Sequence, residues 1–388
     1  MRFFHLSDLH IGKQLHRYSM RVEQEDILNK IVWAAEKEQP DAVVIAGDIY
    51  DKSVPSAEAV ALFDHFLTAM KEQVPQIPLL IIAGNHDSAE RLDYARELLT
   101  ANQVYISGMP PRTDDAYLRK VTLHDAYGAV NFYLMPFVKP FLVRGLLKES
   151  DTLTYDAAVR GVLAREKIDS TKRNVIVSHQ FYVTGSDKPQ TSDSEIAVLG
   201  GIDEVDVSVL KPFDYAALGH IHRAQKIGER RFCYCGTPLK YSVSEEHQQK
   251  SITCVELNKK GTEPVITEIP LEPLRELRSL RGTLEEVLSL ATGENKDDFL
   301  SITLTDEIDP YQPRERLMEV YSHILEIRVD NARTRRIMEE ETFELKLEDP
   351  SAVFAQFFET MQGRSMCEAE TKVMAEIFEK AAEGEVIR

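Results

Sequence analysis

The sequence has no apolar segment close to the roughly 20 residues that a membrane-spanning helix requires, so we expect no membrane contact. Its first residues, MRFFHLSDLH, have neither the apolar core nor the small-residue cleavage site of a signal peptide. Cysteine is scarce, and Cys233 and Cys235 are too close along one strand for an ordinary disulfide. We therefore expect the four cysteines to be buried thiols of a reduced, cytoplasmic protein.

Positive charge is also in short supply, because 46 Lys and Arg face 64 Asp and Glu and the formal net charge is −18. This balance argues against a protein that binds nucleic acid through its own charge alone, since phosphate contacts need Lys and Arg. It does not exclude an enzyme whose metal ions and protein partner supply positive charge. The length of 388 residues and the hydrophobic content of 43% indicate two domains with sizeable cores, with room for an appendage.

Polar residues that suit a metal site follow an apolar segment at residues 79–83 (LLIIA). This segment has the length and composition of a buried strand, and Gly84 ends it. Asn85 could offer a carbonyl oxygen to a metal, and His86 could bind a metal or transfer a proton. If the strands are parallel, these residues lie at the carboxyl edge of the sheet, where ligands bind. A polar turn would be the better interpretation of one such motif on its own.

Four other apolar strands end in the same way. The residues that follow them are Asp8 and His10, Asp48, His179, and the pair His220 and His222. Five of the eleven histidines thus fall at strand ends, and five such endings together argue strongly for a site. We interpret the remaining six as structural or surface residues, with His16 the best placed of them to touch substrate (His5, His16, His65, His124, His247 and His323).

The set offers seven metal ligands, which is too many for one tetrahedral zinc and suits two ions that share Asp48. Two such ions can activate water and stabilise the charge that develops on a phosphate. His86 then remains unligated, as a general acid or electrostatic stabiliser. Mixed nitrogen and oxygen donors without cysteine favour Mn²⁺ or Fe²⁺ over structural zinc. We assign lesser roles to two acids. Asp51 could support a ligand from behind or cap a turn, and we favour the cap; Asp87 orients the turn or His86.

The pattern of segments predicts an α/β fold, a two-sheet β-sandwich flanked by helices, over residues 1–265. Strands at 3–6, 41–46 and 79–83 alternate with helices at 22–35, 57–70 and 91–100. Strands at 130–135, 174–178, 215–218, 232–234 and 251–257 follow, and the last two complete a second sheet packed on the first.

A linker with three prolines at 264–273 separates this domain from a small α+β domain at 275–340. Helices at 283–290 and 316–325 and strands at 299–304 and 326–329 define that second domain. A helical tail at 349–388 begins at Asp349-Pro350 and carries two apolar stripes that need a surface to cover them.

The motifs DLH, GDIYD, GNHD, SH and GHIH, in this order over about 220 residues, resemble the calcineurin-like metallophosphoesterases. The flanking segments DLHIGKQLHRYSMR, GDIYDKSVPS and CGTPLKYSVSEE resemble the SbcD family of nuclease subunits more narrowly. The resemblance implies an Mn²⁺-dependent 3′→5′ exonuclease on duplex ends and an endonuclease on single strands and hairpins. It also implies work in DNA repair, recombination and replication, with an SbcC-type ATPase that controls access of DNA to the site.

The resemblance further implies a role for each residue of the set. One metal is assigned to Asp8, His10, Asp48 and His222, and the other to Asp48, Asn85, His179 and His220. His86 acts on the transition state. The family's two ions are most often Mn²⁺, with Fe²⁺ or Mg²⁺ as alternatives.

The family also implies a heterotetramer of two nuclease and two ATPase subunits, and a homodimer formed by helices near 57–70 and 91–100. The apolar faces of these helices could equally belong to the core. The α+β domain would cap DNA and the tail would hold the ATPase. Substrate contacts are expected from His16, Arg17 and Lys52. Basic residues near the same loops, such as Lys13 and Arg21, could hold phosphates or could equally be ordinary solvated surface charges. Two other interpretations remain: a metallophosphoesterase acting on nucleotides or small phosphoesters, and a non-catalytic scaffold, which the complete ligand set disfavours.

Overall fold

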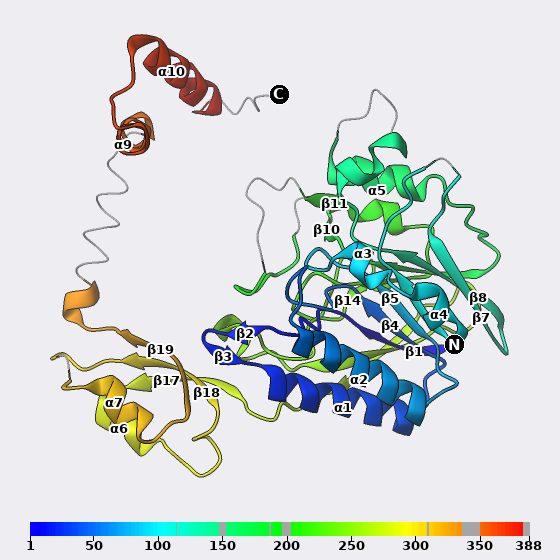
Figure 1. Ribbon diagram of the computed structural model, residues 1–388, viewed down its shortest axis with the longest axis horizontal. Coiled ribbons are helices and arrows are strands. Elements are labelled where there is room, and N and C mark those ends of the chain that lie inside the picture. Colours follow the sequence, from blue (N-terminus) through cyan, green and yellow to red (C-terminus); the bar gives the residue numbers. More distant parts are fainter. Residues whose placement is uncertain are drawn as a thin grey trace. The chain divides into compact units, whose positions relative to one another are not determined.

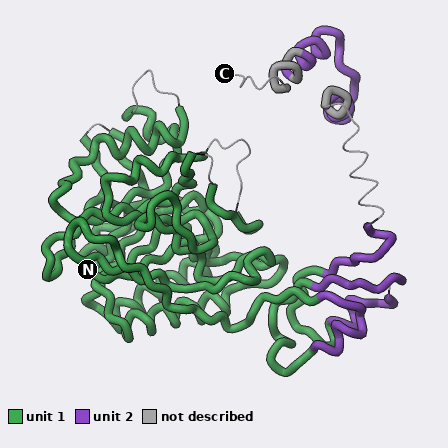
Figure 2. Tube along the Cα trace, turned by 180° about the vertical axis from the view of Figure 1, so that it is seen from behind, with its two compact units in different colours: residues 1–280, 291–301, 318–326 green, residues 281–290, 302–317, 327–388 purple. Residues whose placement is uncertain are grey.

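The computed structural model describes residues 1–113, 115–146, 153–185, 188–195, 203–308, 310–335 and 350–382. The chain divides into two compact units (Figure 2). The first comprises residues 1–280, 291–301 and 318–326, and the second comprises 281–290, 302–317 and 327–388. Within the described ranges, no helix combines the length and the apolar character needed to cross a membrane.

The first sheet has six strands in the order β16-β15-β1-β4-β5-β6. Their bounds are β1 (Arg2–Leu6), β4 (Ala42–Ala46), β5 (Leu79–Ile82), β6 (Val104–Ser107), β15 (Ser251–Glu256) and β16 (Val265–Pro270). Strands β1, β4, β5 and β6 are parallel to one another, whereas β15 pairs antiparallel with β1 and β16 pairs antiparallel with β15. The expectation that 251–257 belongs to the second sheet is therefore wrong. Most of the expected linker at 264–273 is likewise strand β16.

The second sheet also has six strands, in the order β13-β14-β12-β9-β8-β7. Their bounds are β7 (Arg119–Asp125), β8 (Gly128–Met135), β9 (Arg173–Ser178), β12 (Tyr215–Leu218), β13 (Gln225–Lys226) and β14 (Phe232–Tyr234). The four central strands are parallel, and the two edge strands are antiparallel to their neighbours. The carboxyl ends of β8, β9 and β12 therefore share one edge.

The two sheets pack face to face. Alternate residues of a buried strand point to opposite faces of its sheet, so each strand contributes to two cores. In β1, Phe3 points into the space between the sheets, where its ring meets Phe132 and Tyr215 edge-on. Phe4 points to the other side, into the core beneath α1 (Arg21–Glu38) and α2 (Ala57–Gln73). Helix α5 (Tyr155–Leu163) covers the outer face of the second sheet (Figure 1). The expected two-sheet sandwich flanked by helices is confirmed.

The single helix expected at 91–100 is wrong. The chain forms two short helices instead, α3 (Ala89–Leu92) and α4 (Arg96–Ala101). They are separated at Ala95, whose φ of 58° is left-handed. Between them, the carboxylate of Asp93 accepts a hydrogen bond from Gly108 N at 2.7 Å, which holds this segment against the end of β6.

Smaller elements lie along the chain between these strands and helices. They are the hairpin β2 (Gln14–Leu15) and β3 (Tyr18–Ser19), the pair β10 (Phe181–Val183) and β11 (Glu204–Asp206), and the 3₁₀ segments η1 (Pro140–Leu146), η2 (Val207–Leu210) and η3 (Val243–Glu245).

Three of the four cysteines are buried as expected, but Cys367 is exposed, so the expectation of four buried thiols is wrong in this one case.

A three-stranded sheet of order β17-β18-β19 follows. Its strands are β17 (Leu277–Gly282), β18 (Phe299–Leu304) and β19 (His323–Val329), with helices α6 (Leu284–Ser289) and α7 (Pro313–Met318). Helix α6 starts with the expected capping box between Thr283 and Glu286. The helix expected at 316–325 is wrong in its second half, because sheet pairing takes residues from His323 onward into β19.

Two helices close the described part of the chain, α9 (Pro350–Gln362) and α10 (Glu368–Ala382). The expected helix start at Asp349 lies outside the described residues, although α9 begins at the next position.

Candidate metal centre

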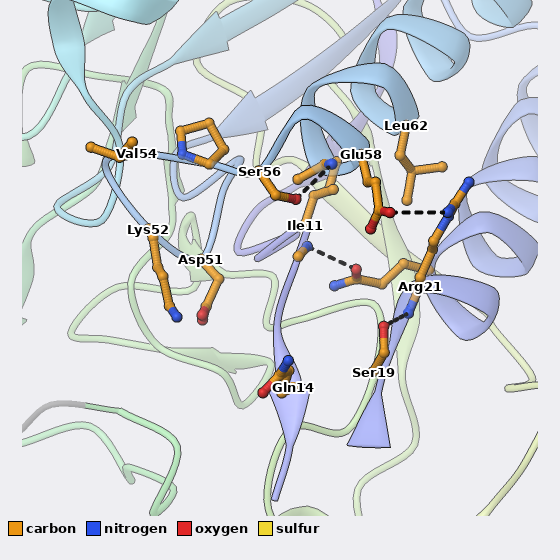
Figure 3. Close-up of a pocket in the computed structure, with 14 residues that line it drawn as sticks. Ile11, Gln14, Ser19, Arg21, Asp51, Lys52, Val54, Ser56, Glu58 and Leu62 are labelled. Atoms are coloured by element: carbon orange, nitrogen blue, oxygen red, sulfur yellow. Dashed lines mark hydrogen bonds and ion pairs between the residues drawn. The ribbon is translucent and has the colours of Figure 1, made fainter. Parts of the chain in front are cut away.

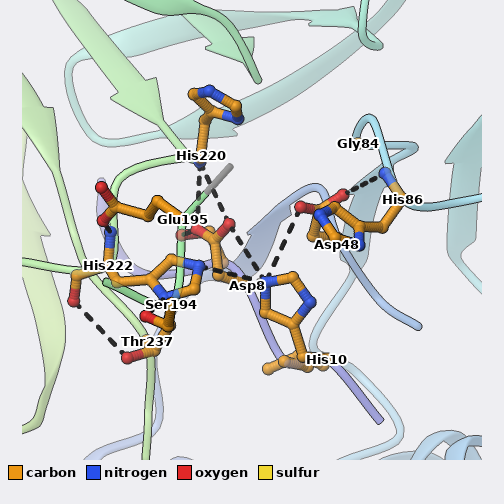
Figure 4. Close-up of polar contacts among 12 residues, drawn as sticks. Asp8, His10, Asp48, Gly84, His86, Ser194, Glu195, His220, His222 and Thr237 are labelled. Carbon is orange, nitrogen blue, oxygen red and sulfur yellow. Dashed lines mark hydrogen bonds and ion pairs between the residues drawn. The ribbon is translucent and has the colours of Figure 1, made fainter. Parts of the chain in front are cut away.

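The five strand endings that carry the expected ligands meet at one edge of the sandwich. Strands β1, β4 and β5 of the first sheet and β9 and β12 of the second deliver them there. The structure brings all seven side chains together, with His86 beside them. Figure 4 shows His86 and five of the seven, Asp8, His10, Asp48, His220 and His222. Parallel strands explain this convergence, because their carboxyl ends lie at the same edge of a sheet.

One cluster of donor atoms surrounds His10. Its Nε2 lies 3.1 Å from Nε2 of His222. The same atom lies 4.0 Å from Oδ1 of Asp8 and 3.8 Å from Oδ2 of Asp48. All four side chains are buried. Two ring nitrogens and two carboxylates that face one point form a donor set suited to a divalent cation.

A second cluster surrounds the amide oxygen of Asn85. This Oδ1 lies 3.0 Å from Nε2 of His179 and 2.9 Å from Nδ1 of His220. Oδ2 of Asp48 lies 3.2 Å from Nε2 of His179. The carboxylate of Asp48 therefore borders both clusters.

The backbone is strained where it presents these side chains. Asp8, His10, Asp48 and His220 all have positive φ values, between 44° and 94°. Such conformations cost a non-glycine residue about 1–2 kcal/mol each. Hydrogen bonds from Asp8 N to Gly47 O at 2.9 Å and from His10 N to Asp48 O at 3.0 Å help to hold them. Strain of this kind concentrates at functional sites.

A glycine permits the closest approach between two of these strand ends. A Cβ atom on Gly84 would overlap the carboxylate and the backbone nitrogen of Asp48. Only glycine therefore lets the loop after β5 lie against the loop after β4.

Burial sets the protonation of the clusters in the absence of a cation. It lowers the pKa of His10 well below its ordinary value and that of His220 to about 3, so both imidazoles are neutral near pH 7. Burial raises the pKa of Asp8 to about 8. Burial also opposes ionisation of Asp48, but the neighbouring His179 holds the pKa of that carboxyl well below its usual range. Burial opposes the charge on His179, but Asp48 raises the pKa of this imidazole to about 9. Near pH 7 the metal-free clusters therefore carry protons on Asp8 and His179, and a bound cation must displace them.

His86 is half-buried at the edge of the clusters. Its backbone N donates to Oδ1 of Asp48 at 2.9 Å, and its Nδ1 lies 2.9 Å from the carbonyl oxygen of Asp51. A carbonyl only accepts, so Nδ1 carries the hydrogen and Nε2 is left without this partner. The His86 and His10 rings are 4.9 Å apart, and His10, Asp48 and His86 also form a group that could hold an ion.

Two neighbouring acids support these loops. Asp87 accepts hydrogen bonds from the backbone of Ile49, Tyr50 and Gly84 at 2.8–3.1 Å, so the expectation that it orients the turn is confirmed. For Asp51 the favoured role of a turn cap is wrong, and the alternative, support of a ligand from behind, is the one that the contacts bear out. Its Oδ1 lies 2.9 Å from Nζ of Lys13 and 3.7 Å from Nδ1 of His10, which places the carboxylate behind His10.

Several residues in contact with the ligands were not anticipated. Ser194 and Glu195 hydrogen-bond His222, and Ser194 also contacts Glu245. The rings of Phe137 and Phe181 flank His220, and Tyr241 lies beside His10. Tyr241 and Glu245 lie in the segment CGTPLKYSVSEE, whose resemblance was noted without a role for either residue.

The expected substrate-binding residues lie on the segments that follow β1 and β4. His16 and Arg17 are exposed in the turn of the β2–β3 hairpin, and the Arg17 guanidinium lies over the Tyr18 ring at 5.4 Å. Lys52 lines a polar pocket of about 380 Å³ together with Asp51 and Arg21 (Figure 3). Lys13 is held by Asp51, which limits its freedom to bind phosphate.

Comparison with known proteins agrees with this geometry. Residues 1–224 match the calcineurin-like phosphoesterase family, and residues 273–362 match the type 5 capsule protein repressor C-terminal domain. The SbcD component of the SbcCD nuclease from Staphylococcus epidermidis is 30% identical over 377 residues, covering 96% of both chains. The SbcD component of the SbcCD nuclease from Staphylococcus saprophyticus is 31% identical over 386 residues, covering 97% of both chains. The chain therefore belongs to the calcineurin-like phosphoesterases and, within them, to the SbcD components of SbcCD nucleases.

Proposed function

We propose that this protein is the nuclease subunit of an SbcCD-type complex and hydrolyses DNA phosphodiester bonds with two divalent cations. The observation that carries the proposal is the position of Asp48, whose Oδ2 lies 3.8 Å from Nε2 of His10 and 3.2 Å from Nε2 of His179. One carboxylate between two donor clusters is the arrangement that a two-metal centre needs. The two relatives named as components of the SbcCD nuclease support DNA as the substrate.

The donor atoms divide between two cations. Asp8, His10, Asp48 and His222 would hold one cation, and Asp48, Asn85, His179 and His220 would hold the other. The mixture of imidazole nitrogens with carboxylate and amide oxygens favours Mn²⁺, with Fe²⁺ or Mg²⁺ as alternatives. The chemistry that such a pair supplies is activation of water and neutralisation of the charge that develops on the phosphate.

His86 serves as the general acid or electrostatic stabiliser at the leaving oxygen. The hydrogen bond between its Nδ1 and the carbonyl of Asp51 fixes the ring, and Nε2 is left for substrate. In its imidazolium form His86 carries a hydrogen on each nitrogen, so it can keep the Asp51 contact through Nδ1 and donate the Nε2 proton to the departing oxygen. Such general acids typically contribute about 10²–10⁴ in rate.

The two segments after the nuclease domain would hold the DNA and the partner subunit. We assign residues 1–265 to the nuclease, 275–340 to a domain that caps DNA, and 349–388 to a tail that binds the SbcC-type ATPase. A complex of two nuclease and two ATPase subunits would add the basic surface that a chain of net charge −18 does not itself provide. The activities expected are 3′→5′ exonuclease cleavage of duplex ends and endonuclease cleavage of single strands and hairpins.

The test uses purified protein with Mn²⁺, with and without the ATPase. Labelled hairpin DNA and a bis(p-nitrophenyl) phosphodiester are offered in parallel reactions. Cleavage of the hairpin that depends on added Mn²⁺ and stops with a chelator is the expected result. Hydrolysis of the small ester without any DNA cleavage, even with the ATPase, would favour a metallophosphoesterase of nucleotides or small esters instead.

A further inference from the structure

We propose that Ser194 is a positioning residue of the metal centre: its hydroxyl links His222 to the buried Glu245–Lys250 pair and fixes the ring with Nε2 free to bind a cation. The inference rests on the proposed function, because it takes His222 as a metal ligand. Ser194 itself touches neither cluster of donor atoms and acts through His222.

The first step concerns the two nitrogens of the His222 ring. Nε2 faces the first cluster, 3.1 Å from Nε2 of His10. Nδ1 points away from it and lies 2.7 Å from Oγ of Ser194 (Figure 4). A neutral imidazole carries its proton on one nitrogen only, so the partner of Nδ1 decides whether Nε2 keeps its lone pair.

The second step concerns the single proton of the Ser194 hydroxyl. Oγ also lies 2.6 Å from Oε1 of Glu245. An ionised carboxylate only accepts hydrogen bonds, so Ser194 donates its proton to Glu245. Its oxygen is then left to accept a hydrogen bond from Nδ1–H of His222, and this leaves Nε2 unprotonated.

The third step concerns the charge on Glu245, which is fully buried. Nζ of Lys250 lies 2.6 Å from its other oxygen, Oε2. Oγ1 of Thr237, the carbonyl oxygen of His222 and Oε1 of Gln248 also lie 2.7–3.0 Å from this Nζ, so its three N–H groups are shared among four acceptors. A buried ion pair with its remaining donors satisfied keeps Glu245 ionised.

The backbone of His222 is held from the same segment. Its N–H donates to Oε1 of Glu195 at 2.5 Å, and Oε2 of Glu195 accepts from Ser192 N at 3.0 Å. Residues 194 and 195 thus fix both the ring and the main chain of one ligand. His179 shows the contrasting arrangement, since its Nδ1 lies 2.7 Å from the backbone carbonyl of Ala46 and needs no such side chain.

The experiment is a calorimetric titration of Mn²⁺ into the metal-free full-length protein. The unaltered chain is expected to bind two ions. Ser194→Ala should weaken one of the two sites by about tenfold or more and leave the other unchanged, since loss of such an outer partner typically costs 10–100-fold. Ser194→Thr keeps the hydroxyl and should restore binding to within about threefold. Thr191→Ala removes an exposed hydroxyl from the same segment and should bind both ions normally.

Wild-type affinity at both sites of Ser194→Ala would overturn the inference, and so would an equal loss in Thr191→Ala. Failure of the unaltered chain to bind Mn²⁺ would instead overturn the proposed function. If thermal melting shows that Ser194→Ala does not fold, a measurement on the unaltered protein tests the inference instead. Nitrogen NMR of ¹⁵N-histidine in the metal-free chain should show His222 protonated at Nδ1, and protonation at Nε2 would refute the proposal.

Discussion

At the scale of single residues, the candidate metal centre depends on close approach between loops that only particular side chains permit. Four of the expected ligands have positive φ, and the loops after β4 and β5 meet where Gly84 has no side chain. The local conformations are individually unfavourable, so the hydrogen bonds of Asp87 and of the loop backbones must hold them in place.

Gly84→Ala should damage the centre without touching a ligand. The added methyl would overlap the Asp48 carboxylate, so Asp48 must move away from both clusters. We expect at least about a tenfold loss of Mn²⁺ affinity and a loss of about 1–3 kcal/mol in the free energy of unfolding, as for overpacked sites. Calorimetry and chemical denaturation measure the two effects. Gly293→Ala, where a Cβ atom meets open space, serves as the control and should change neither.

His86→Ala should separate metal binding from cleavage. If His86 acts on the leaving group, the variant keeps both Mn²⁺ affinities within about threefold and loses about 10²-fold or more in the rate of DNA cleavage. Loss of one bound ion would instead make His86 a ligand beside His10 and Asp48, a grouping that the geometry allows. Full cleavage activity in the variant would refute its catalytic role.

At the scale of elements, the sequence predicted best what depends on neighbours along the chain. Each expected ligand directly follows a buried strand, so the position of the strand was enough to place the side chain at the shared edge. Ser194 and Glu245 were missed because they lie 51 residues apart and meet through the fold, for which no local spacing exists.

Long-range pairing also explains the wrong secondary structure. The segment from His323 has apolar residues at helical spacing, but it pairs into the β17-β18-β19 sheet. Residues 251–257 form a strand as expected, yet local pattern does not say that β15 adds to β1 rather than to the second sheet. Break points inside helices are similarly hidden, as at Ala95 between α3 and α4.

The ion pair between Asp125 of β7 and Arg173 of β9 should make the free energy of unfolding decrease at acid pH. Hydrogen bonds from Arg173 hold the pKa of Asp125 well below its ordinary value, and the amino group of Met1 acts in the same direction. A carboxyl with a depressed folded-state pKa stabilises the protein above its unfolded pKa of about 4, and this contribution is lost as the pH falls below that value.

Asp125→Asn tests this contact. The variant should lose about 1–3 kcal/mol of unfolding free energy at pH 7, in the range for hydrogen bonds to charged groups. The difference from the unaltered protein should narrow as the pH is lowered from 5 to 3. Urea denaturation at several pH values measures it, and a difference that stays constant with pH would contradict the expectation.

At the scale of the whole molecule, exposed apolar side chains indicate where this chain meets other chains. Tyr94 and Leu98, near the break between α3 and α4, are 81% and 75% exposed. Large apolar side chains that are exposed next to one another mark interaction sites more often than single exposed apolar residues do. We propose that this segment and α2 form the homodimer. Leu98→Glu should shift the protein from dimer to monomer in light scattering at micromolar concentration. An unaltered chain that is monomeric there would refute the assignment.

The helical tail presents a second exposed apolar face. Phe357 and Met361 lie one turn apart on α9 and are 57% and 65% exposed, as expected for a helix that docks on another protein. Burying each side chain in an interface is worth about 1.5–3 kcal/mol, so removing both should weaken binding of the SbcC-type ATPase by about 100-fold or more.

The tail prediction calls for a double variant, Phe357→Ser with Met361→Ser, whose affinity for the purified ATPase is measured by calorimetry. Gln356→Ser with Thr360→Ser alters the neighbouring polar positions of the same helix and should bind normally. Hydrolysis of a small phosphodiester by the nuclease alone should be equal in both variants, because α9 contributes no residue to the candidate metal centre. Unchanged ATPase binding after deletion of residues 350–388 would show that the partner is held elsewhere, and the tail's apolar stripes would then require another surface.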